Sequence, residues 1–257
     1  MTAVSILSII GLLISSICMK QILDQNSSKQ FFYPIFIFTI IVLSVFTFTL
    51  ITTYSIKLNF ILALLFTFLI LNYLLLLLMF IKPVHHLALI LLPLTAAIVG
   101  ITLISDFQQS SHEIDNNLLL HVIVSLVSYG LLGLAAIQAL LLKFQEKKLK
   151  RLESSMLSNL LPPMELMEKI MFDLIVIGFL LLTLSLMTGA PFVSFNADNL
   201  TLQKISFSII AWVVYSYLIY QRYSSNVSGK KATNLAISGM LFLFIAYIGT
   251  KTIFGMF

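Results

Sequence analysis

Long, continuous apolar runs constrain the fold of this chain more than any other feature. The clearest is Ile61–Phe80, where ILALLFTFLILNYLLLLLMF contains no charged residue. A helix needs roughly 20 mostly apolar residues to cross a bilayer, and this run meets that length. Segments that span a bilayer must satisfy their own backbone hydrogen bonds, so they are helices or closed barrels. The runs are continuous and do not alternate as barrel strands do, so the sequence predicts helices.

The composition also indicates a membrane protein. Of the 257 residues, 60% are hydrophobic and only 10% are charged, and the mean hydropathy is +1.06. About a quarter of the residues of a soluble domain are usually charged. We therefore expect an all-α, polytopic membrane helix bundle, with residues 1–257 forming a single integral membrane domain. The first run has no basic start and no small-residue cleavage site, which favours a retained helix over a signal peptide.

Polar connections separate eight apolar runs, which predicts eight transmembrane helices. The first four, within residues 1–105, are mostly Leu, Ile, Phe and Thr and are expected to form an apolar support half. The last four, within residues 117–257, carry most of the polar side chains expected at membrane depth. The predicted spans are residues 3–19, 32–52, 59–80, 87–105, 117–142, 172–193, 204–221 and 233–254.

The distribution of Lys and Arg predicts the orientation of these helices. Basic residues concentrate in cytoplasmic connections. Twelve lie in the first, third, fifth and seventh connections: Lys20, Lys29, Lys82, Lys143, Lys147, Lys148, Lys150, Arg151, Lys169, Arg222, Lys230 and Lys231. The other three are Lys57, Lys204 and Lys251. Both termini are therefore expected on the non-cytoplasmic side. The net charge of +5 suits contact with the lipid bilayer, and no basic stretch is interleaved with aromatics as expected for nucleic acid.

The longest predicted connection, residues 143–171, begins with a basic stretch and is interrupted by Pro162 and Pro163. In Met164–Met171 (MELMEKIM) the apolar side chains share one helical face, which predicts a short amphipathic helix on the inner membrane surface. We expect this cytoplasmic connection to be either a solvated linker or a docking site for a partner.

A polar stripe runs along the predicted fifth helix, starting one turn inside its outer end at His121. At about 100° per residue, the same face carries Ser125, Ser128 and Tyr129. Ionisable side chains at membrane depth are costly, and they usually point into the bundle and serve a function. His121 is therefore expected to be a ligand for a metal or haem iron, or a histidine hydrogen-bonded to a neighbouring helix.

A second stripe follows the predicted seventh helix through Lys204, Ser208, Trp212 and Tyr215. Trp212 is the single Trp of the chain, and it is expected to pack against a neighbouring helix or to contact a cofactor. Lys204, at the outer end, either extends to the membrane interface or neutralises an anion such as a propionate.

Other polar side chains allow weaker hypotheses. A cluster in the outer connection is either solvated or a divalent-cation site, although its spacing matches no specific ligand pattern; it comprises Asp106, His112, Glu113 and Asp115. His85 and His86, at the inner edge of the fourth helix, are expected to be interfacial or inner haem-relay ligands. Asp173 is the nearest candidate for a carrier carboxylate. The chain has no phosphate-binding loop, zinc-binding helix motif, C-x-x-C or nucleophile elbow, so we expect no enzyme activity.

Several blocks of the second half resemble a known family in order and spacing. From Leu118, LLLHVIVSLVSYGLLGLAAIQALLL resembles the H-x-x-x-S-x-x-S-Y helix of the cytochrome c assembly superfamily, the haem-handling CcsA, CcmC and CcmF proteins. The stretch LPPMELMEKIMFDLIVIGFLLLTLSLMTGA is similar to the next block. K-x-x-x-S-x-x-A-W-x-V-Y at Lys204–Tyr215 and S-G-K-K-A…G…AYIG at Ser228–Gly249 are similar to the last two helices. The combination is most similar to the YpjD or HemX-like branch of inner-membrane proteins, over about residues 117–257.

This resemblance implies a haem (heme) site on the outer side. In the haem-handling members the histidine of this helix is an outer axial ligand, which implies that His121 binds haem iron. Ser125, Tyr129, Lys204 and Trp212 would complete the site. Those members also carry a Trp-rich W-G-x-x-W-x-W-D loop and a second outer histidine. Here the corresponding loop reads APFVSFNADNLTLQ, and no histidine follows His121.

We therefore expect a multi-pass accessory protein of the bacterial inner membrane rather than a cytochrome c synthase acting alone. Its partners would be haem or a protein of cytochrome c maturation or haem biosynthesis. Two alternatives stay open. One is a non-catalytic scaffold or regulator that acts through residues 143–171 without haem. The other is a subunit of an ion transport or efflux system.

Overall fold

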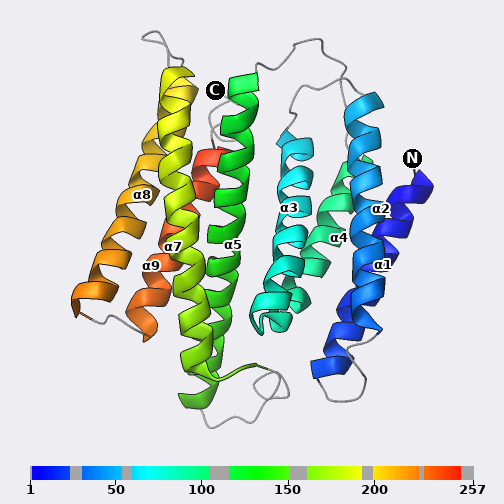
Figure 1. Ribbon diagram of the computed structural model, residues 1–257, viewed down its shortest axis with the longest axis horizontal. Helices are drawn as coiled ribbons and strands as arrows, with labels where there is room; N and C mark the ends of the chain where they lie inside the picture. The colour runs from blue at the N-terminus through cyan, green and yellow to red at the C-terminus, as the bar shows by residue number, and fades with distance from the viewer. Residues whose placement is uncertain are drawn as a thin grey trace. The chain divides into compact units, whose positions relative to one another are not determined.

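The computed structural model describes residues 2–23, 31–53, 60–104, 116–150, 161–192, 199–225 and 229–249. All secondary structure in these ranges is helical (Figure 1), which confirms the predicted all-α class. The α-helices are α1 (Thr2–Leu23), α2 (Phe32–Thr53), α3 (Phe60–Ile81), α4 (Ala88–Ile104), α5 (Asn116–Lys150), α7 (Met164–Gly189), α8 (Asn199–Ser225) and α9 (Gly229–Phe244). Short segments are η1 (His85–Leu87), η2 (Ala190–Phe192) and the π-helical η3 (Ile245–Gly249).

Among the described helices, 7 are long and apolar enough to cross a membrane: α1 to α4 (with η1 preceding α4), α5, α7 and α8. The α9 helix has 16 residues and continues directly into η3. The sequence therefore predicted correctly a polytopic bundle of membrane helices. The eighth span and the orientation of the termini stay predictions.

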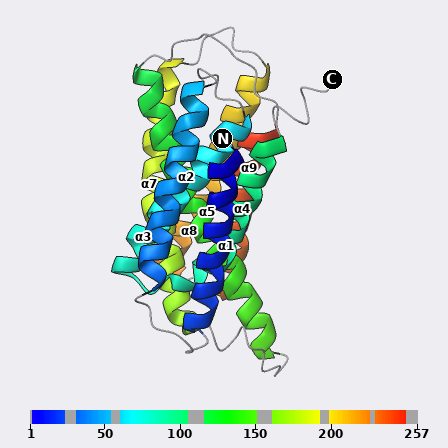
Figure 2. The ribbon, with the colours of Figure 1, turned by 90° about the vertical axis from the view of Figure 1, so that its right-hand side faces the viewer.

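The chain divides into two compact units, residues 1–114 and residues 115–257. In the first unit α1 packs against α2 and α4, and α3 packs against the same two helices. Successive helices run in opposite directions (Figures 1 and 2). Where α1 meets α2, a Cβ atom on Gly11 would lie 2.7 Å from Thr39 Oγ1. A glycine lets the two backbones approach closely here, as small residues do in membrane helix pairs.

The first unit also contains specific polar contacts between helices. Asn72 of α3 donates through Nδ2 to Thr95 Oγ1 of α4 over 2.8 Å, and the Asn72 side chain is fully buried. The Tyr33 hydroxyl of α2 lies 2.9 Å from His85 Nε2 of η1. Polar side chains within a bilayer require partners on neighbouring helices. The N-terminal half therefore contains hydrogen bonds between its helices in addition to the apolar helices that its sequence predicts.

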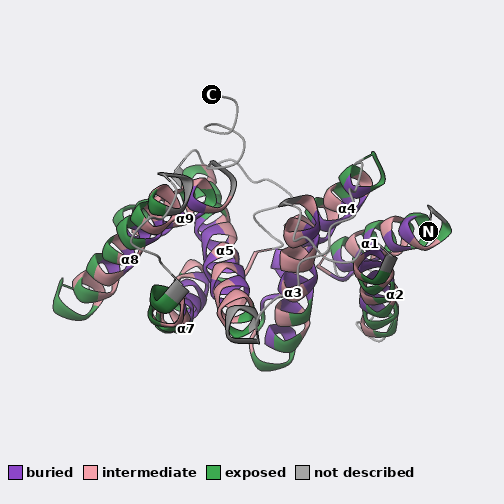
Figure 3. Cartoon of the chain, turned by 90° about the horizontal axis from the view of Figure 1, so that it is seen from above, coloured by how far each residue is buried: buried purple, intermediate pink, exposed green. Residues whose placement is uncertain are grey.

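In the second unit α5 packs against α7 and α9, and α8 packs against the same two helices. Viewed from above, the buried residues line the faces at which these helices meet (Figure 3). A Cβ on Gly178 of α7 would lie 2.8 Å from Leu132 of α5, and one on Gly239 of α9 would lie 2.7 Å from the Tyr215 ring of α8. Small residues thus set the spacing of both helix pairs.

The connection predicted for residues 143–171 is too long, because helices occupy both of its ends. The α5 helix continues to Lys150, and Met164–Met171 form the first two turns of α7 rather than a separate amphipathic helix. The Met167 side chain is fully buried, and its backbone carbonyl accepts a hydrogen bond from Gln138 Nε2 of α5 over 3.1 Å. The apolar face seen in the sequence therefore packs against protein, which joins this segment to the spanning helix.

Candidate functional site

The α7 helix presents two different faces to its neighbours in the second unit. The face toward α5 contains residues that contact His121, Ser128, Leu132 and Gln138; they are Met167, Gly178, Ser185, Thr188 and Gly189. The face toward α8 contains Glu168, Phe172, Phe179 and Thr183. Because consecutive helical residues are turned by about 100°, these two sets point in different directions.

His121 lies in the second turn of α5, half-buried against the last turn of α7. Its Nδ1 atom is 3.0 Å from the Ser185 carbonyl oxygen and 3.4 Å from Thr188 Oγ1. A carbonyl only accepts hydrogen bonds, so the ring donates through Nδ1, and Nε2 takes no part in this contact. A Cβ on Gly189 would lie 2.6 Å from His121 Cε1. The glycine therefore makes room for the ring in this position.

The hydrogen bond from His121 to α7 is the one that the sequence offered as an alternative to metal ligation. The two roles do not compete, because they use different ring nitrogens. Metal-binding histidines commonly donate their other N–H to a backbone carbonyl, which sets the tautomer and the ring orientation. The contact with Ser185 therefore orients the ring and leaves Nε2 as the nitrogen that a metal would use.

The other polar side chains of the α5 stripe have partners within the second unit. Ser125 Oγ donates within its own helix to the Val122 carbonyl over 2.8 Å. Tyr129 forms a side-chain hydrogen bond with Ser208 of α8. Its ring also meets the Tyr247 ring of η3 edge-on, with centroids 6.2 Å apart. Tyr129 thus links three elements of the unit.

Trp212 contacts a different face of α7 from the one that His121 contacts. Trp212 Nε1 donates to Thr183 Oγ1 over 2.8 Å, and its ring stacks on Phe179 with centroids 5.6 Å apart. Both partners belong to the face of α7 that meets α8, whereas His121 occupies the face that meets α5. Lys204 is partly exposed in the second turn of α8. His121 and Trp212 therefore contact different faces of α7, whereas Tyr129 of α5 reaches Ser208, which lies one turn from both Lys204 and Trp212 on α8.

The remaining candidate ligands form no metal cluster within the described ranges. There, no group of three or more His, Cys, Asp or Glu side chains is arranged to hold a metal ion. The predicted outer cluster of Asp106, His112, Glu113 and Asp115 lies outside the described residues. His86 is buried.

An ion pair at the other end of the second unit was missed from the sequence. Arg222 Nη1 of α8 donates to Glu168 Oε1 of α7 over 2.8 Å, and the guanidinium lies 4.4 Å from the centroid of the Phe172 ring. The second Glu168 oxygen accepts the Gly229 N–H at the start of α9 over 3.2 Å. Gly229 has a φ of +63°, which glycine adopts most readily. The sequence contained the two charges, but their pairing depends on how α7 and α8 are rotated.

Comparisons with known proteins agree with the family resemblance. The profile of the cytochrome c assembly protein family matches residues 2–256. Inner membrane protein YpjD of Escherichia coli (strain K12) is 31% identical over 171 residues, which are 64% of this chain and 64% of YpjD. Cytochrome c biogenesis protein CcsA of Prochlorococcus marinus (strain AS9601) is 28% identical over 187 residues, which are 62% of this chain and 59% of CcsA. The matches thus span less than two thirds of these relatives. No solved structure matches the chain.

Proposed function

The chain belongs to the cytochrome c assembly protein family and is a multi-pass protein of the bacterial inner membrane; from this premise we propose that it binds haem with His121 as an iron ligand. The observation that carries this proposal is the hydrogen bond between His121 Nδ1 and the Ser185 carbonyl. It uses Nδ1 as the donor, leaves Nε2 as the ring nitrogen for a metal, and sets the direction of the ring. His121 also stands at the histidine position of the motif that the chain shares with haem-handling members of the superfamily.

The residues around His121 fit this role. The His121 imidazole would hold haem through its iron, and haem when bound would supply a redox-active iron. The Ser185 carbonyl increases the basicity of the ring, as outer partners of ligating histidines do. Gly189 leaves the space that the ring occupies, and Lys204 supplies a positive charge for a propionate on the same end of the unit. For Trp212 we propose a packing role between α7 and α8, because its indole N–H and its ring are both engaged there.

We further propose an accessory role rather than an enzyme activity. The outer loop before Lys204 lacks the Trp-rich motif of the superfamily's haem-handling members. A site built on His121 alone suits transient binding of haem that is exchanged with a protein of cytochrome c maturation or haem biosynthesis. For the topology we propose eight transmembrane spans, of which α9 and η3 together form the last. Both termini then lie on the non-cytoplasmic side. The excess of basic residues in alternate connections supports this orientation.

The absorption spectrum of the detergent-purified protein, with haemin added in known amounts, tests the haem proposal. The wild type should develop a Soret band that saturates, and His121→Ala should lose it. In Gly189→Ala the added methyl group displaces the ring, so haem affinity should fall by about tenfold. Gly133→Ala is the matched control, because a Cβ there would meet only Met240 Cε at an ordinary 3.6 Å.

Two outcomes would contradict the haem proposal. One is a folded wild-type protein that develops no band at any haemin concentration. The other is a band of equal strength in His121→Ala. The size-exclusion profile of each variant separates a lost ligand from a lost fold.

A further inference from the structure

The α5 and α9 helices lie side by side in the second unit (Figure 3). Two contacts between them define how they are aligned. A Cβ on Gly133 of α5 would lie 3.6 Å from Met240 Cε of α9, and Lys143 Nζ of α5 donates to Asn234 Oδ1 of α9 over 2.9 Å. Residue numbers rise along α5 as they fall along α9, so the two helices are antiparallel.

Lysines gather where this helix pair ends. Lys147 follows Lys143 by four residues on α5, and Lys230 precedes Asn234 by four residues on α9. Four residues make about one helical turn, so Lys147 and Lys230 lie level with each other, one turn past the hydrogen bond. The three lysine side chains are exposed. The end of the pair therefore presents ammonium groups on two levels, with Lys143 on one and the other two lysines on the next.

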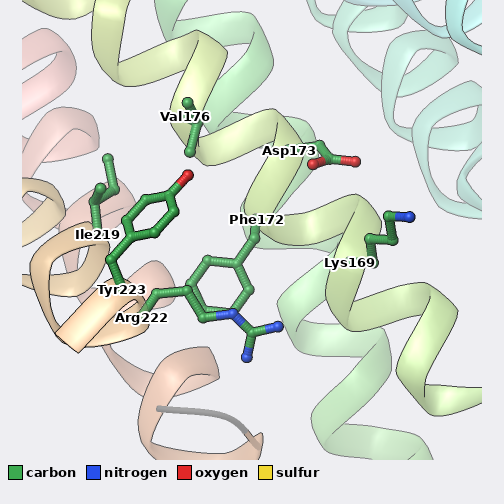
Figure 4. A pocket seen from close by; sticks show the side chains of 7 residues that line it. All are labelled: Lys169, Phe172, Asp173, Val176, Ile219, Arg222 and Tyr223. Atoms are coloured by element: carbon green, nitrogen blue, oxygen red, sulfur yellow. The ribbon is translucent and has the colours of Figure 1, made fainter. Parts of the chain in front are cut away.

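Few carboxylates lie near these lysines. The α9 helix contains no acidic residue, and on α5 Glu146 follows Lys143 by three residues. Glu168 of α7 pairs with Arg222, and Asp173 of α7 lines a separate crevice of about 160 Å³ between α7 and α8 (Figure 4). Like charges one turn apart destabilise a helix, so an anion bound among the lysines would stabilise this end of the pair.

The two helices also offer an apolar surface next to the lysines. The part of α5 that is long and apolar enough to cross a membrane ends at Lys148, which places the lysines at the depth of the lipid headgroups. Leu140 of α5 and Leu241 of α9 lie farther from this end, and both are exposed. A ligand that fits both surfaces has an anionic headgroup and acyl chains. This combination favours an anionic phospholipid over an acidic protein or a free anion.

We propose that this end of the α5–α9 pair binds cardiolipin, an anionic phospholipid whose headgroup carries two phosphates. One phosphate lies beside Lys143 and the other between Lys147 and Lys230, while the acyl chains follow the exposed leucines. Basic sites between membrane helices bind cardiolipin headgroups in this way. A glycerol joins the two phosphates, so the second binds at a high effective concentration. This linkage favours cardiolipin over two separate molecules of phosphatidylglycerol.

Native mass spectrometry of the detergent-purified full chain tests this proposal. Delipidated protein receives cardiolipin and twice the molar amount of phosphatidylglycerol, so that both lipids supply equal phosphate. The wild type should retain one cardiolipin in preference to phosphatidylglycerol. Lys147→Gln and Lys230→Gln should each lower the affinity for cardiolipin by about fivefold. Lys169→Gln, the same change at an exposed lysine of α7, is the matched control and should leave the affinity unchanged.

Lys147→Arg keeps the positive charge and should retain cardiolipin. The proposal is overturned if Lys147→Gln and Lys169→Gln retain equal amounts of cardiolipin, or if phosphatidylglycerol binds equally well, since only general contact with anionic lipid would then be present. Release of cardiolipin by millimolar inorganic phosphate would identify a site for free anions, and its displacement by polyglutamate would identify a surface for acidic proteins. Either result would also overturn the proposal. The test does not depend on haem, because His121 lies near the other end of α5.

Discussion

Individual polar side chains in the second unit find their partners on neighbouring helices. His121 contacts the Ser185 carbonyl, and Trp212 donates to Thr183. An unpaired polar group within a bilayer costs several kcal/mol. These contacts therefore constrain the rotation of α5 and α8 about their axes relative to α7. The same cost explains why potential ligands such as His121 already have one atom engaged.

The Glu168→Gln substitution tests the ion pair at the residue scale. Glutamine keeps the size of the side chain but removes the charge that faces Arg222. The Glu168 side chain is only 16% exposed, so the loss should exceed that of a surface pair. We expect the free energy of unfolding to fall by about 1–2 kcal/mol, measured by denaturation in detergent. Glu165→Gln, an exposed position on the same helix, should change it by less than about 0.5 kcal/mol. Equal effects of both substitutions would assign the pair no stabilising role.

At the scale of elements, α7 packs against two neighbours, α5 and α8, through two different faces. Its α5 face contains the small residues Gly178, Ser185 and Gly189, which allow close packing. Its α8 face contains larger side chains such as Phe172 and Phe179. The helices consequently pack closely on one side of α7 and diverge on the other, and this difference opens the crevice beside α8.

The Gly178→Ala substitution tests the close packing of α5 and α7. A Cβ at this position would lie 2.8 Å from Leu132 Cγ and Cδ2 and 3.3 Å from the Leu132 backbone nitrogen. The helices would have to separate, so the free energy of unfolding should fall by about 1–3 kcal/mol. Gly133→Ala has space for its methyl group and should be neutral or stabilising by up to about 1 kcal/mol. Thermal denaturation followed by circular dichroism compares the two variants. Equal melting temperatures would contradict the inference that Gly178 is needed for close packing of α5 and α7.

Over the whole molecule, helix direction alternates along each unit, and the basic residues follow that alternation. In the first unit Lys20 and Lys82 lie at the same end. In the second unit Lys143, Arg222 and Lys230 do so (Figure 1). Alternate ends of a polytopic protein face opposite sides of the membrane, and Lys and Arg concentrate on the cytoplasmic side.

Topology reporters test the proposed orientation of the whole chain. Fusions of alkaline phosphatase and of a fluorescent protein after Arg151 and after Phe257 should report opposite sides, with Arg151 in the cytoplasm. This outcome requires an odd number of spans between the two positions, which α7, α8 and α9 with η3 provide. If both fusions report the cytoplasm, α9 and η3 do not cross the membrane and the proposed count of eight is wrong.

Much of this protein could be predicted from local sequence. Each apolar run is long enough to form its own helix, and a membrane helix satisfies its backbone within one segment. The all-α class and the approximate helix positions therefore followed without knowledge of any long-range contact, and the order of the sequence blocks indicated the family. The stripes of polar residues were also visible, because helical periodicity is a local property. The haem hypothesis combined residues of both stripes, namely His121, Lys204 and Trp212, in one site.

Only the tertiary structure decided which side chains of the two stripes contact which helix. Trp212 and His121 both belong to the haem hypothesis, but the rotation of α7 places their partners on different faces of that helix. The pairing of Glu168 with Arg222, and the joining of Met164–Met171 to α7, depend on the same packing. Helix rotation is set by the sum of small-residue contacts and interhelical hydrogen bonds from several segments. These contacts come from several segments and cannot be identified in any single stretch of sequence. Local patterns therefore determined the helices, and the packing of the helices determined the candidate sites.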